Sequence, residues 1–176
     1  MDPINLKKVK PSEVQTLLNV SREMFFTAFA HLNTVDDMAL YAAKAFTIEK
    51  LSEELSNPDS HFYFAILNEN IAGYIKLNTH TAQTEFQDPQ ALEIERIYVG
   101  AKFQNQQIGK QLLQFAIDKA VENKCEYIWL GVWDANHNAI RFYKRHGFQI
   151  FSSHEFMLGN DKQTDLLMKK VLEENL

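Results

Sequence analysis

The segment from residue 91 to residue 123 changes its hydrophobic period across a short polar loop. The first part, ALEIERIYV, alternates between polar and apolar residues as a β-strand does. One side of this strand is expected to carry Glu93, Glu95, Ile97 and Val99. After the loop GAKFQNQQIG, apolar residues recur at helical spacing from Gln106 to Asn123. The segment therefore predicts a strand that leads through a loop into a helix.

A strand, loop and helix in this order form a potential anion site. The first turn of a helix leaves about four backbone N–H groups without intrahelical partners, and it carries a partial positive charge. Phosphate groups are common ligands at such a helix end. Gly100 and Gly109 can equally be turn and packing residues, so the loop alone leaves both interpretations open.

The remaining patterns predict an α/β (α+β) fold, in which a mixed sheet of about seven strands has helices on both faces. The expected strands cover residues 4–10, 61–67, 71–79, 91–99, 126–133, 148–156 and 164–172. The expected helices cover residues 12–31, 36–56 in one or two pieces, 106–123 and 136–145. A three-residue turn, NEN, is expected between the second and third strands.

Composition narrows the classes of function. The net charge of −5 argues against a nucleic-acid surface and favours cationic small molecules as partners. The single cysteine, Cys125, cannot form an intrachain disulfide, which fits the cytoplasm. No window approaches the ~20 apolar residues of a membrane span, and the six histidines lack metal-ligand spacing. We therefore expect a cytoplasmic protein without a metal, with no membrane or nucleic-acid partner.

A second motif, NHNAIRFYKRHGF at residues 136–148, follows IYV and Q-x-x-Q-I-G-K in the chain. Together these motifs resemble the GNAT superfamily of acetyl-CoA-dependent N-acetyltransferases. The segments LEIERIYV, IWLGVW and QTDLLMKK are similar to those of the bacterial PaiA-type spermidine/spermine N-acetyltransferases. The resemblance implies one GNAT domain over residues 1–176, with the acyl-CoA N-acyltransferase fold.

The resemblance also implies acetyl-CoA as the cofactor. Its pantetheine arm is expected along the backbone of Ile97, Tyr98 and Val99, with the Val99 N–H group facing the thioester oxygen. Asn136 is expected to contact the arm from the other side, and Asn138 and Tyr143 are also expected to bind the cofactor. The pyrophosphate is expected on the N–H groups of Gln104, Asn105, Gln106, Gln107, Ile108, Gly109 and Lys110. Gln107 departs from the family pattern because it stands where a glycine is expected, so its Cβ limits the approach of phosphate.

Acetyl transfer to an amine requires a proton acceptor, since an alkyl ammonium has a pKa near ~10.4 and cannot attack while protonated. The resemblance favours Glu95 for this role, with Glu93 as the alternative. Either carboxylate can instead be a structural group, paired for example with Arg96. Tyr143 is expected to donate a proton or a hydrogen bond to the leaving thiolate, although its helical spacing also suits a core aromatic residue.

The implied acceptor is a small primary amine, most specifically a polyamine. Other small amines and protein amines remain open, as does a module that senses acetyl-CoA and regulates a partner. Both a monomer and a homodimer are compatible with the sequence. Carboxylates in segments that border the acceptor cleft of the family are Glu23, Asp36, Asp37, Glu85 and Asp88. The sequence assigns none of them individually.

Overall fold

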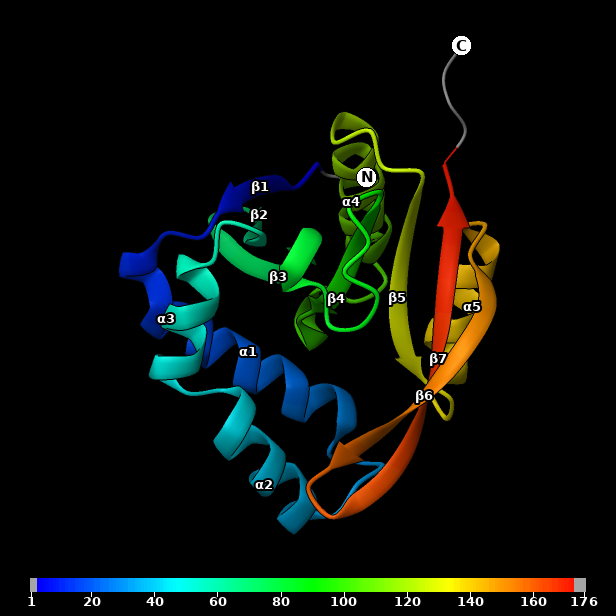
Figure 1. Cartoon of the computed structure of the whole chain (residues 1–176). Coiled ribbons are helices and arrows are strands. Elements are labelled where there is room, and N and C mark those ends of the chain that lie inside the picture. The colour runs from blue at the N-terminus through cyan, green and yellow to red at the C-terminus, as the bar shows by residue number, and fades with distance from the viewer. Residues whose placement is uncertain (1–2, 173–176) are drawn as a thin grey trace.

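The computed structural model describes residues 3–172, which form one seven-stranded sheet in the order β1-β2-β3-β4-β5-β7-β6 (Figure 1). The strands are β1 (Asn5–Lys8), β2 (Ser60–Leu67), β3 (Asn70–Asn78), β4 (Ala91–Val99), β5 (Tyr127–Trp133), β6 (Gln149–Leu158) and β7 (Asp161–Val171). Strands β4 and β5 are parallel, and every other neighbouring pair is antiparallel. The predicted mixed and mostly antiparallel sheet is confirmed.

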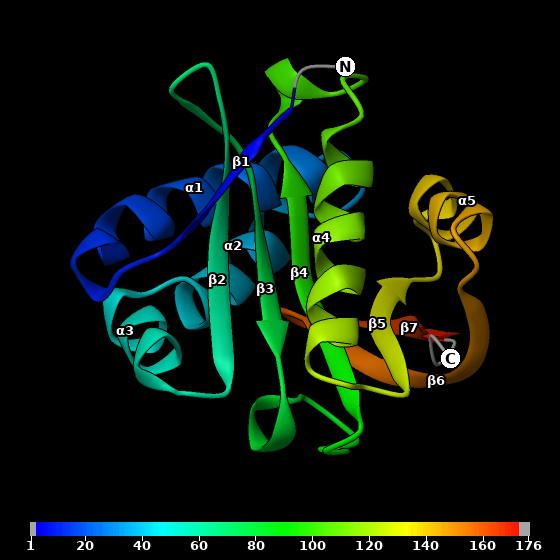
Figure 2. The ribbon, with the colours of Figure 1, turned by 90° about the horizontal axis from the view of Figure 1, so that it is seen from above.

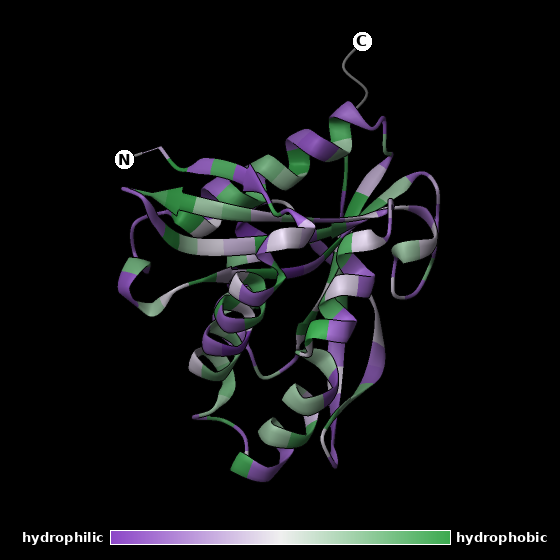
Figure 3. Ribbon diagram, turned by 90° about the vertical axis from the view of Figure 1, so that its left-hand side faces the viewer, coloured by the Kyte–Doolittle hydropathy of each residue, from purple (hydrophilic) through white to green (hydrophobic). Residues whose placement is uncertain are grey.

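Helices cover both faces of this sheet, as Figure 2 shows. They are α1 (Val14–Phe29), α2 (Val35–Ala45), α3 (Ile48–Ser56), α4 (Ile108–Glu122) and α5 (His137–Arg145), with short 3-10 helices at Pro11–Glu13, His80–Ala82 and Ala101–Phe103. Apolar residues of α4 and α5 pack with one face of the sheet, and those of α1, α2 and α3 pack with the other. The helices in Figure 3 accordingly alternate between hydrophobic and hydrophilic segments. Across the described residues, each helix is too short or too polar to span a membrane.

The two central strands β4 and β5 stay together for only part of their length. Residues 91–94 of β4 pair with residues 127–130 of β5, and the pairing ends there. Beyond this point β4 continues to Val99 and β5 continues to Trp133 without pairing between the two strands. The separation opens a cleft between the strands, close to the middle of the sheet.

A β-bulge in β4 reverses the side to which its residues point. Lys76 of β3 lies opposite Arg96, but the next residue, Leu77, lies opposite Ile94, so Glu95 is an extra residue in β4. Ile97 and Val99 consequently pack on the α4 side together with Ile94. The expectation of one shared side for Glu93, Glu95, Ile97 and Val99 is therefore wrong. Both glutamates contact groups on the opposite side, because strict alternation fails at a bulge.

Two local predictions also need correction. The turn between β2 and β3 has two residues rather than three, because Asn70 already pairs with Leu67. Asn68 and Glu69 both have positive φ angles, as tight hairpin turns of this kind require. Helix α4 begins at Ile108 instead of Gln106, since Gln107 adopts a left-handed conformation (φ 60°, ψ 18°) that does not continue a helix.

One end of the cleft is closed by contacts between α2 and the hairpin of β6 and β7. The N–H group of Asn160, in the hairpin turn, donates a hydrogen bond of 2.8 Å to Asp37 Oδ1. Leu158 is buried among apolar residues of α1 and α2. Gly159 has a φ of 61°, and a Cβ there would lie 2.5 Å from the Asp37 Cα atom. The hairpin can approach α2 this closely only because residue 159 has no side chain.

Gly159→Ala is expected to destabilise the protein more than Gly147→Ala. Both glycines have positive φ angles, so both substitutions incur the left-handed penalty of about 1–2 kcal/mol. The new Cβ at 159 also meets rigid backbone, whereas at 147 it meets the flexible end of Lys170. Urea unfolding of both variants tests this, and equal losses of unfolding free energy would contradict the close packing at Gly159.

Candidate active site

The cleft between the separated strands has a volume of about 480 Å³. It is bounded by β4 and β5, with further contributions from α1, α5, β6 and β7. Residues predicted from the sequence that line it are Glu93, Glu95, Ile97, Tyr98, Val99, Gln104, Asn136 and Tyr143. The two strand ends and the two sequence motifs thus meet at one place.

The remaining predicted residues lie outside the cleft. The loop and helix start at Asn105, Gln106, Gln107, Ile108, Gly109 and Lys110 do not line it. Helix α4 nevertheless begins beside the end of β4, because a Cβ built on Gly109 would lie 3.9 Å from Val99 Cγ2. Asn138 is exposed and accepts a hydrogen bond from Arg141. The structure therefore does not bring Asn138 to the cleft with Asn136, which caps α5 by accepting a hydrogen bond from the N–H group of Ala139.

Glu95 belongs to a buried group of two cations and two carboxylates. Lys76 Nζ lies 2.5 Å from Glu95 Oε2 and 3.2 Å from Glu54 Oε2. The Arg96 guanidinium lies 3.3 Å from Glu95 and 3.2 Å from Glu54. Burial alone would raise the pKa of Glu95, but the charges of Arg96 and Lys76 hold that pKa below its ordinary value. The charged form of Glu95 is therefore favoured, in a group of two cations and two carboxylates.

Glu93 lies in a different environment, although one amide group links the two carboxylates. Asn78 Nδ2 donates to Glu93 over 3.0 Å and to Glu95 over 2.6 Å. The backbone N–H and the hydroxyl of Thr84 also donate to Glu93, over 2.9 and 2.5 Å. Burial raises the pKa of Glu93, and the hydrogen bonds from Thr84 and Asn78 offset this only in part. The environments of the two glutamates thus shift their pKa values in opposite directions.

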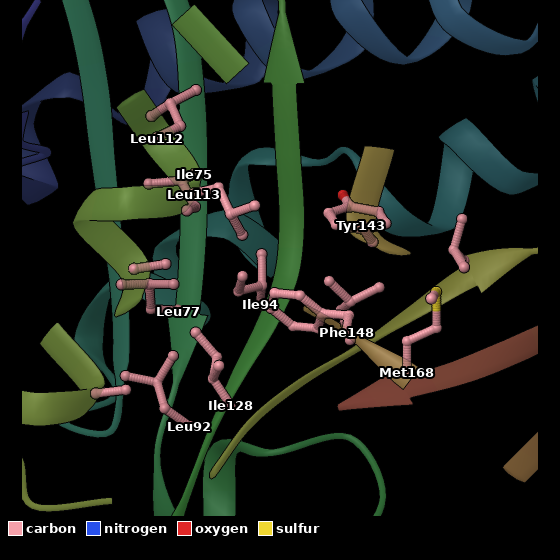
Figure 4. Close-up of a cluster of buried hydrophobic side chains, with 14 of the residues drawn as sticks. Ile75, Leu77, Leu92, Ile94, Leu112, Leu113, Ile128, Tyr143, Phe148 and Met168 are labelled. Atoms are coloured by element: carbon pink, nitrogen blue, oxygen red, sulfur yellow. The ribbon is translucent and has the colours of Figure 1, made fainter. Parts of the chain in front are cut away.

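Tyr143 projects from α5 toward the strands (Figure 4). Its ring packs near Phe142 and Phe148, with centroid distances of 5.3 and 5.8 Å. Burial raises the pKa of the Tyr143 hydroxyl well above its ordinary value. The residue lines the cleft and belongs to the apolar core at the same time, so its position is compatible with both interpretations of the sequence.

Comparison with known proteins assigns the fold to a family. The model of the acetyltransferase (GNAT) family matches residues 22–148. The chain belongs to this family. This GNAT protein is accordingly an N-acetyltransferase, as the sequence motifs predict.

Three similar proteins carry the comparison further. One relative is the uncharacterized N-acetyltransferase in the pepI 3′ region of Lactobacillus delbrueckii subsp. lactis. It is 42% identical over 172 residues, which cover 98% of this chain and 99% of that protein. The spermidine N(1)-acetyltransferase of Thermoplasma acidophilum is 25% identical over 155 residues, covering 84% and 89%. One similar solved structure is the PaiA N-acetyltransferase from Thermoplasma acidophilum in complex with coenzyme A. Its TM-score is 0.79 at 23% identity, and the match covers 98% of this chain and 100% of that chain. The predicted likeness to PaiA-type enzymes is confirmed.

Two features of this GNAT protein fit a bound coenzyme A. The first hydrogen bond of α4 joins Gln111 N–H to Gln107 O, so the N–H groups of Ile108, Gly109 and Lys110 have no partner within the helix. Asn105 and Gln107 both have positive φ angles, 64° and 60°, which turns the backbone of the preceding loop. Alternating backbone conformations of this kind can gather N–H groups around an anion. The arrangement suits a pyrophosphate although no glycine stands at position 107.

The exposed edge of β4 fits an extended ligand. Gly100 N–H donates to Ala72 O in β3 over 2.9 Å. Because successive N–H groups of a strand point to opposite edges, those of Val99 and Ile97 point toward the cleft. β5 has already separated from β4 at this level. A pantetheine arm could therefore pair with β4 in place of the missing strand.

Several cleft residues were not identified from the sequence. They include Gly131 on β5, His154 on β6 and Asp165 on β7. Their positions depend on the pairing of three strands, which no local pattern reveals. Only Gly131 leaves a mark in the sequence, because a glycine inside an otherwise apolar strand often marks a place where a ligand or another backbone comes close.

The carboxylates expected near the acceptor mostly have other contacts. Asp37 accepts the hydrogen bond from Asn160, and Asp88 accepts one from the Tyr127 hydroxyl. Glu85 pairs with His154, which does line the cleft. The cleft is lined by none of the five carboxylates expected at its border, which are Glu23, Asp36, Asp37, Glu85 and Asp88. Among residues 3–172, the structure shows no group of three or more His, Cys, Asp or Glu side chains that could hold a metal ion.

The buried group of Lys76, Arg96, Glu54 and Glu95 is expected to contribute to the stability of the fold. Glu95→Gln and Glu54→Gln should each leave one uncompensated positive charge in the buried group and lower the free energy of unfolding by about 3 kcal/mol. Glu54 contacts the same two cations but does not line the cleft, so it is the matched control. Denaturant unfolding measures both losses. A change below about 0.5 kcal/mol in either variant, the range of ordinary surface substitutions, would show that the group is not a coupled ionic cluster.

Proposed function

We propose that this protein transfers the acetyl group of acetyl-CoA to a primary amine of a small polyamine such as spermidine or spermine. The observation that carries the proposal is the cleft between β4 and β5. On its walls lie strand N–H groups without a partner strand, two carboxylates with opposite pKa shifts and a buried tyrosine. Acetyl-CoA supplies an activated thioester, and the residues around the cleft have to orient it and accept a proton.

In this proposal the backbone holds and polarises the thioester. Ile97, Tyr98 and Val99 pair with the pantetheine arm, and the N–H groups from Gln104 to Lys110 hold the pyrophosphate. Val99 N–H faces the thioester oxygen, where negative charge grows during attack. A fixed donor aimed at such a charge is among the strongest contributions that an enzyme makes to catalysis.

Glu95 is the proposed proton acceptor. The acceptor amine arrives as an ammonium ion, and the Glu95 carboxylate is proposed to take its proton directly or through a water molecule. The Glu95 side chain is 20% exposed, whereas Glu93 is buried. Access therefore favours Glu95, although the raised pKa of Glu93 makes that group the stronger base.

Tyr143 is proposed to stabilise the departing thiolate. An ordinary thiol has a pKa near ~8.5, and an ordinary tyrosine has a pKa near ~10. Burial raises the pKa of Tyr143 and so widens this difference. The hydroxyl consequently stays protonated and is a weak acid toward the thiolate. Its main contribution is then a hydrogen bond to sulfur, with complete proton transfer to follow from solvent.

The polyamine assignment rests on relatives and on charge. The similar Thermoplasma acidophilum protein is named a spermidine N(1)-acetyltransferase, and a 64-residue stretch is 33% identical to the spermine/spermidine N(1)-acetyltransferase of Bacillus subtilis. The chain carries a net charge of −5, and carboxylates line the cleft. Both features attract a multivalent cation more strongly than a singly charged amine.

Turnover of acetyl-CoA across a panel of amines tests the function. We expect the highest kcat/KM for spermidine or spermine, lower values for lysine peptides, and only background release of CoA without an amine. Preference for a lysine peptide would contradict the polyamine assignment and leave N-acetyl transfer intact. Tight acetyl-CoA binding without turnover of any amine would instead favour a sensing module.

Tyr143→Phe is expected to lower kcat by roughly a hundredfold to a thousandfold, the range for loss of one hydrogen-bond donor to a developing negative charge. The affinity for acetyl-CoA should change little, because the aromatic ring still fills its place beside Phe148. Steady-state kinetics and calorimetric titration measure the two effects. Wild-type kcat in the variant, under conditions where chemistry limits the rate, would remove Tyr143 from the mechanism.

Gly109→Ala should stabilise the free protein and weaken CoA binding. The added methyl group would lie 3.9 Å from Val99 Cγ2 and 4.0 Å from Phe142 Cζ, both ordinary contacts, so alanine can stabilise α4 by up to roughly 0.5–1 kcal/mol. The same methyl lies at the proposed pyrophosphate site and should weaken CoA binding by about tenfold, or ~1.4 kcal/mol. Urea unfolding and calorimetry give the two values. An unchanged CoA affinity would place the pyrophosphate elsewhere.

A further inference from the structure

The acceptor side of the cleft contains a row of three residues on neighbouring strands. Trp133 of β5 lies directly opposite Asp165 of β7, and Asp165 lies directly opposite His154 of β6. Direct cross-strand neighbours have Cβ atoms about 4.5–5.5 Å apart, so the three side chains stand side by side on one face. All three line the cleft. The row therefore offers an aromatic ring, a carboxylate and an imidazole to the same space.

Gly131 makes room beside this row. It precedes Trp133 by two residues and so faces the same side of β5. A Cβ built on Gly131 would lie 3.6 Å from Asp165 Oδ2 and 3.6 Å from Leu167 Cδ2. The Asp165 carboxylate thus borders the space that a larger side chain at residue 131 would fill. The glycine lengthens the cleft toward β7.

Negative charge at this place exceeds the positive charge. The one ion-pair partner of Asp165 within residues 3–172 is His154, whose Nε2 lies 3.6 Å from Oδ2. The other ring nitrogen of His154 contacts Glu85, so one imidazole lies between two carboxylates and can balance at most one of them. By contrast, Lys76 and Arg96 fully balance Glu95 and Glu54. Burial, together with the nearby Asp134 and Glu85, raises the pKa of Asp165, as expected for a carboxylate short of a cation.

Apolar surface continues from this place toward the centre of the cleft. The Trp133 ring lies 6.4 Å from the Phe29 ring, centroid to centroid, and both residues line the cleft. Aromatic faces attract ammonium groups and also cover methylene chains, which a carboxylate cannot do. The combination suits a molecule with a charged end and an alkyl chain.

We propose that the space over Gly131, bounded by Asp165, His154 and Trp133, binds the second, non-reacting ammonium group of a diamine or polyamine acceptor. The inference rests on the proposed function, because it takes the reacting nitrogen to lie near Glu95. Asp165 neutralises the distal ammonium, and the aromatic rings of Trp133 and Phe29 cover the methylene spacer. Gly131 and Asp165 are then the residues that select a diamine over a monoamine of equal length.

The test compares diaminobutane with butylamine, two acceptors of equal chain length that differ in the second amine. Asp165→Asn should lower the ratio of kcat/KM for the diamine to that for the monoamine by at least about tenfold. Asp134→Asn is the matched control, because it removes an equal charge from an exposed neighbour that does not line the cleft. Equal effects of the two variants on the ratio, or no effect of Asp165→Asn, would overturn the subsite.

Gly131→Ala supplies a second variant. Its methyl group would make only ordinary contacts in the fold, and we expect it to lower the same ratio by narrowing the space next to Asp165. An unchanged ratio in this variant would overturn the role of Gly131. Thermal unfolding of each variant verifies that it is folded.

A binding measurement separates this inference from the proposed function. Calorimetric titration of diaminobutane into the protein with CoA present should show weaker binding in Asp165→Asn than in Asp134→Asn. Failure of the wild-type protein to acetylate any amine would overturn the proposed function, and the titration would still decide the subsite. Equal diamine affinities in both variants would overturn the subsite even if acetylation is observed.

Discussion

The separation of β4 from β5 after four paired residues is the feature on which the site depends. A central pair of strands normally satisfies the backbone of both partners, and here the second half of each strand lacks that partner. Unpaired N–H groups in a protein interior cost free energy unless a ligand or water binds them. A ligand that pairs with β4 would remove this cost. The site proposed for an extended arm therefore follows from the topology of the sheet and not from any single side chain.

The sheet can open between β4 and β5 because contacts away from this opening hold the surrounding strands in place. On one side, β7 pairs with β5 along the full length of β5, from Tyr127 to Trp133. On the other, the hairpin of β6 and β7 packs on α2 through Leu158, Gly159 and the Asp37–Asn160 hydrogen bond. The cleft is thus enclosed by segments that are far apart in the sequence. Figure 1 shows this hairpin extending below the sheet toward α2.

Charge inside the cleft is balanced at one end and unbalanced at the other. Near the bulge, Lys76 and Arg96 match Glu54 and Glu95, which lets these groups be buried without an uncompensated charge. Near β7, Asp165 and Glu85 share one imidazole. In the proposed function, a cationic acceptor would meet a charge-balanced carboxylate, Glu95, at its reacting end and an unmatched one, Asp165, at its distal end. This difference supports a role for the two ends in catalysis and in selection, respectively.

Sequence periodicity predicted the strand and helix order well, because hydrophobic period and turn residues are local properties. Every predicted strand and helix is present, and errors at the ends come from local backbone conformations such as the left-handed Gln107. The bulge at Glu95 was missed, since it is defined by pairing with β3 and leaves no separate mark in β4. The error was consequential, because it put both glutamates on the wrong side relative to Ile97 and Val99.

The sequence by itself determined the family and the order of strand, loop and helix from residue 91 to residue 122, because each depends on contiguous stretches of residues. Only the tertiary structure decided which charges balance which, that Asn138 stays outside the cleft, and that Asp165, His154 and Gly131 belong to it. These facts depend on strand register and on contacts between residues far apart in the chain. Electrostatic and steric interactions act through space, so a list of residues in order cannot specify them until the chain has folded.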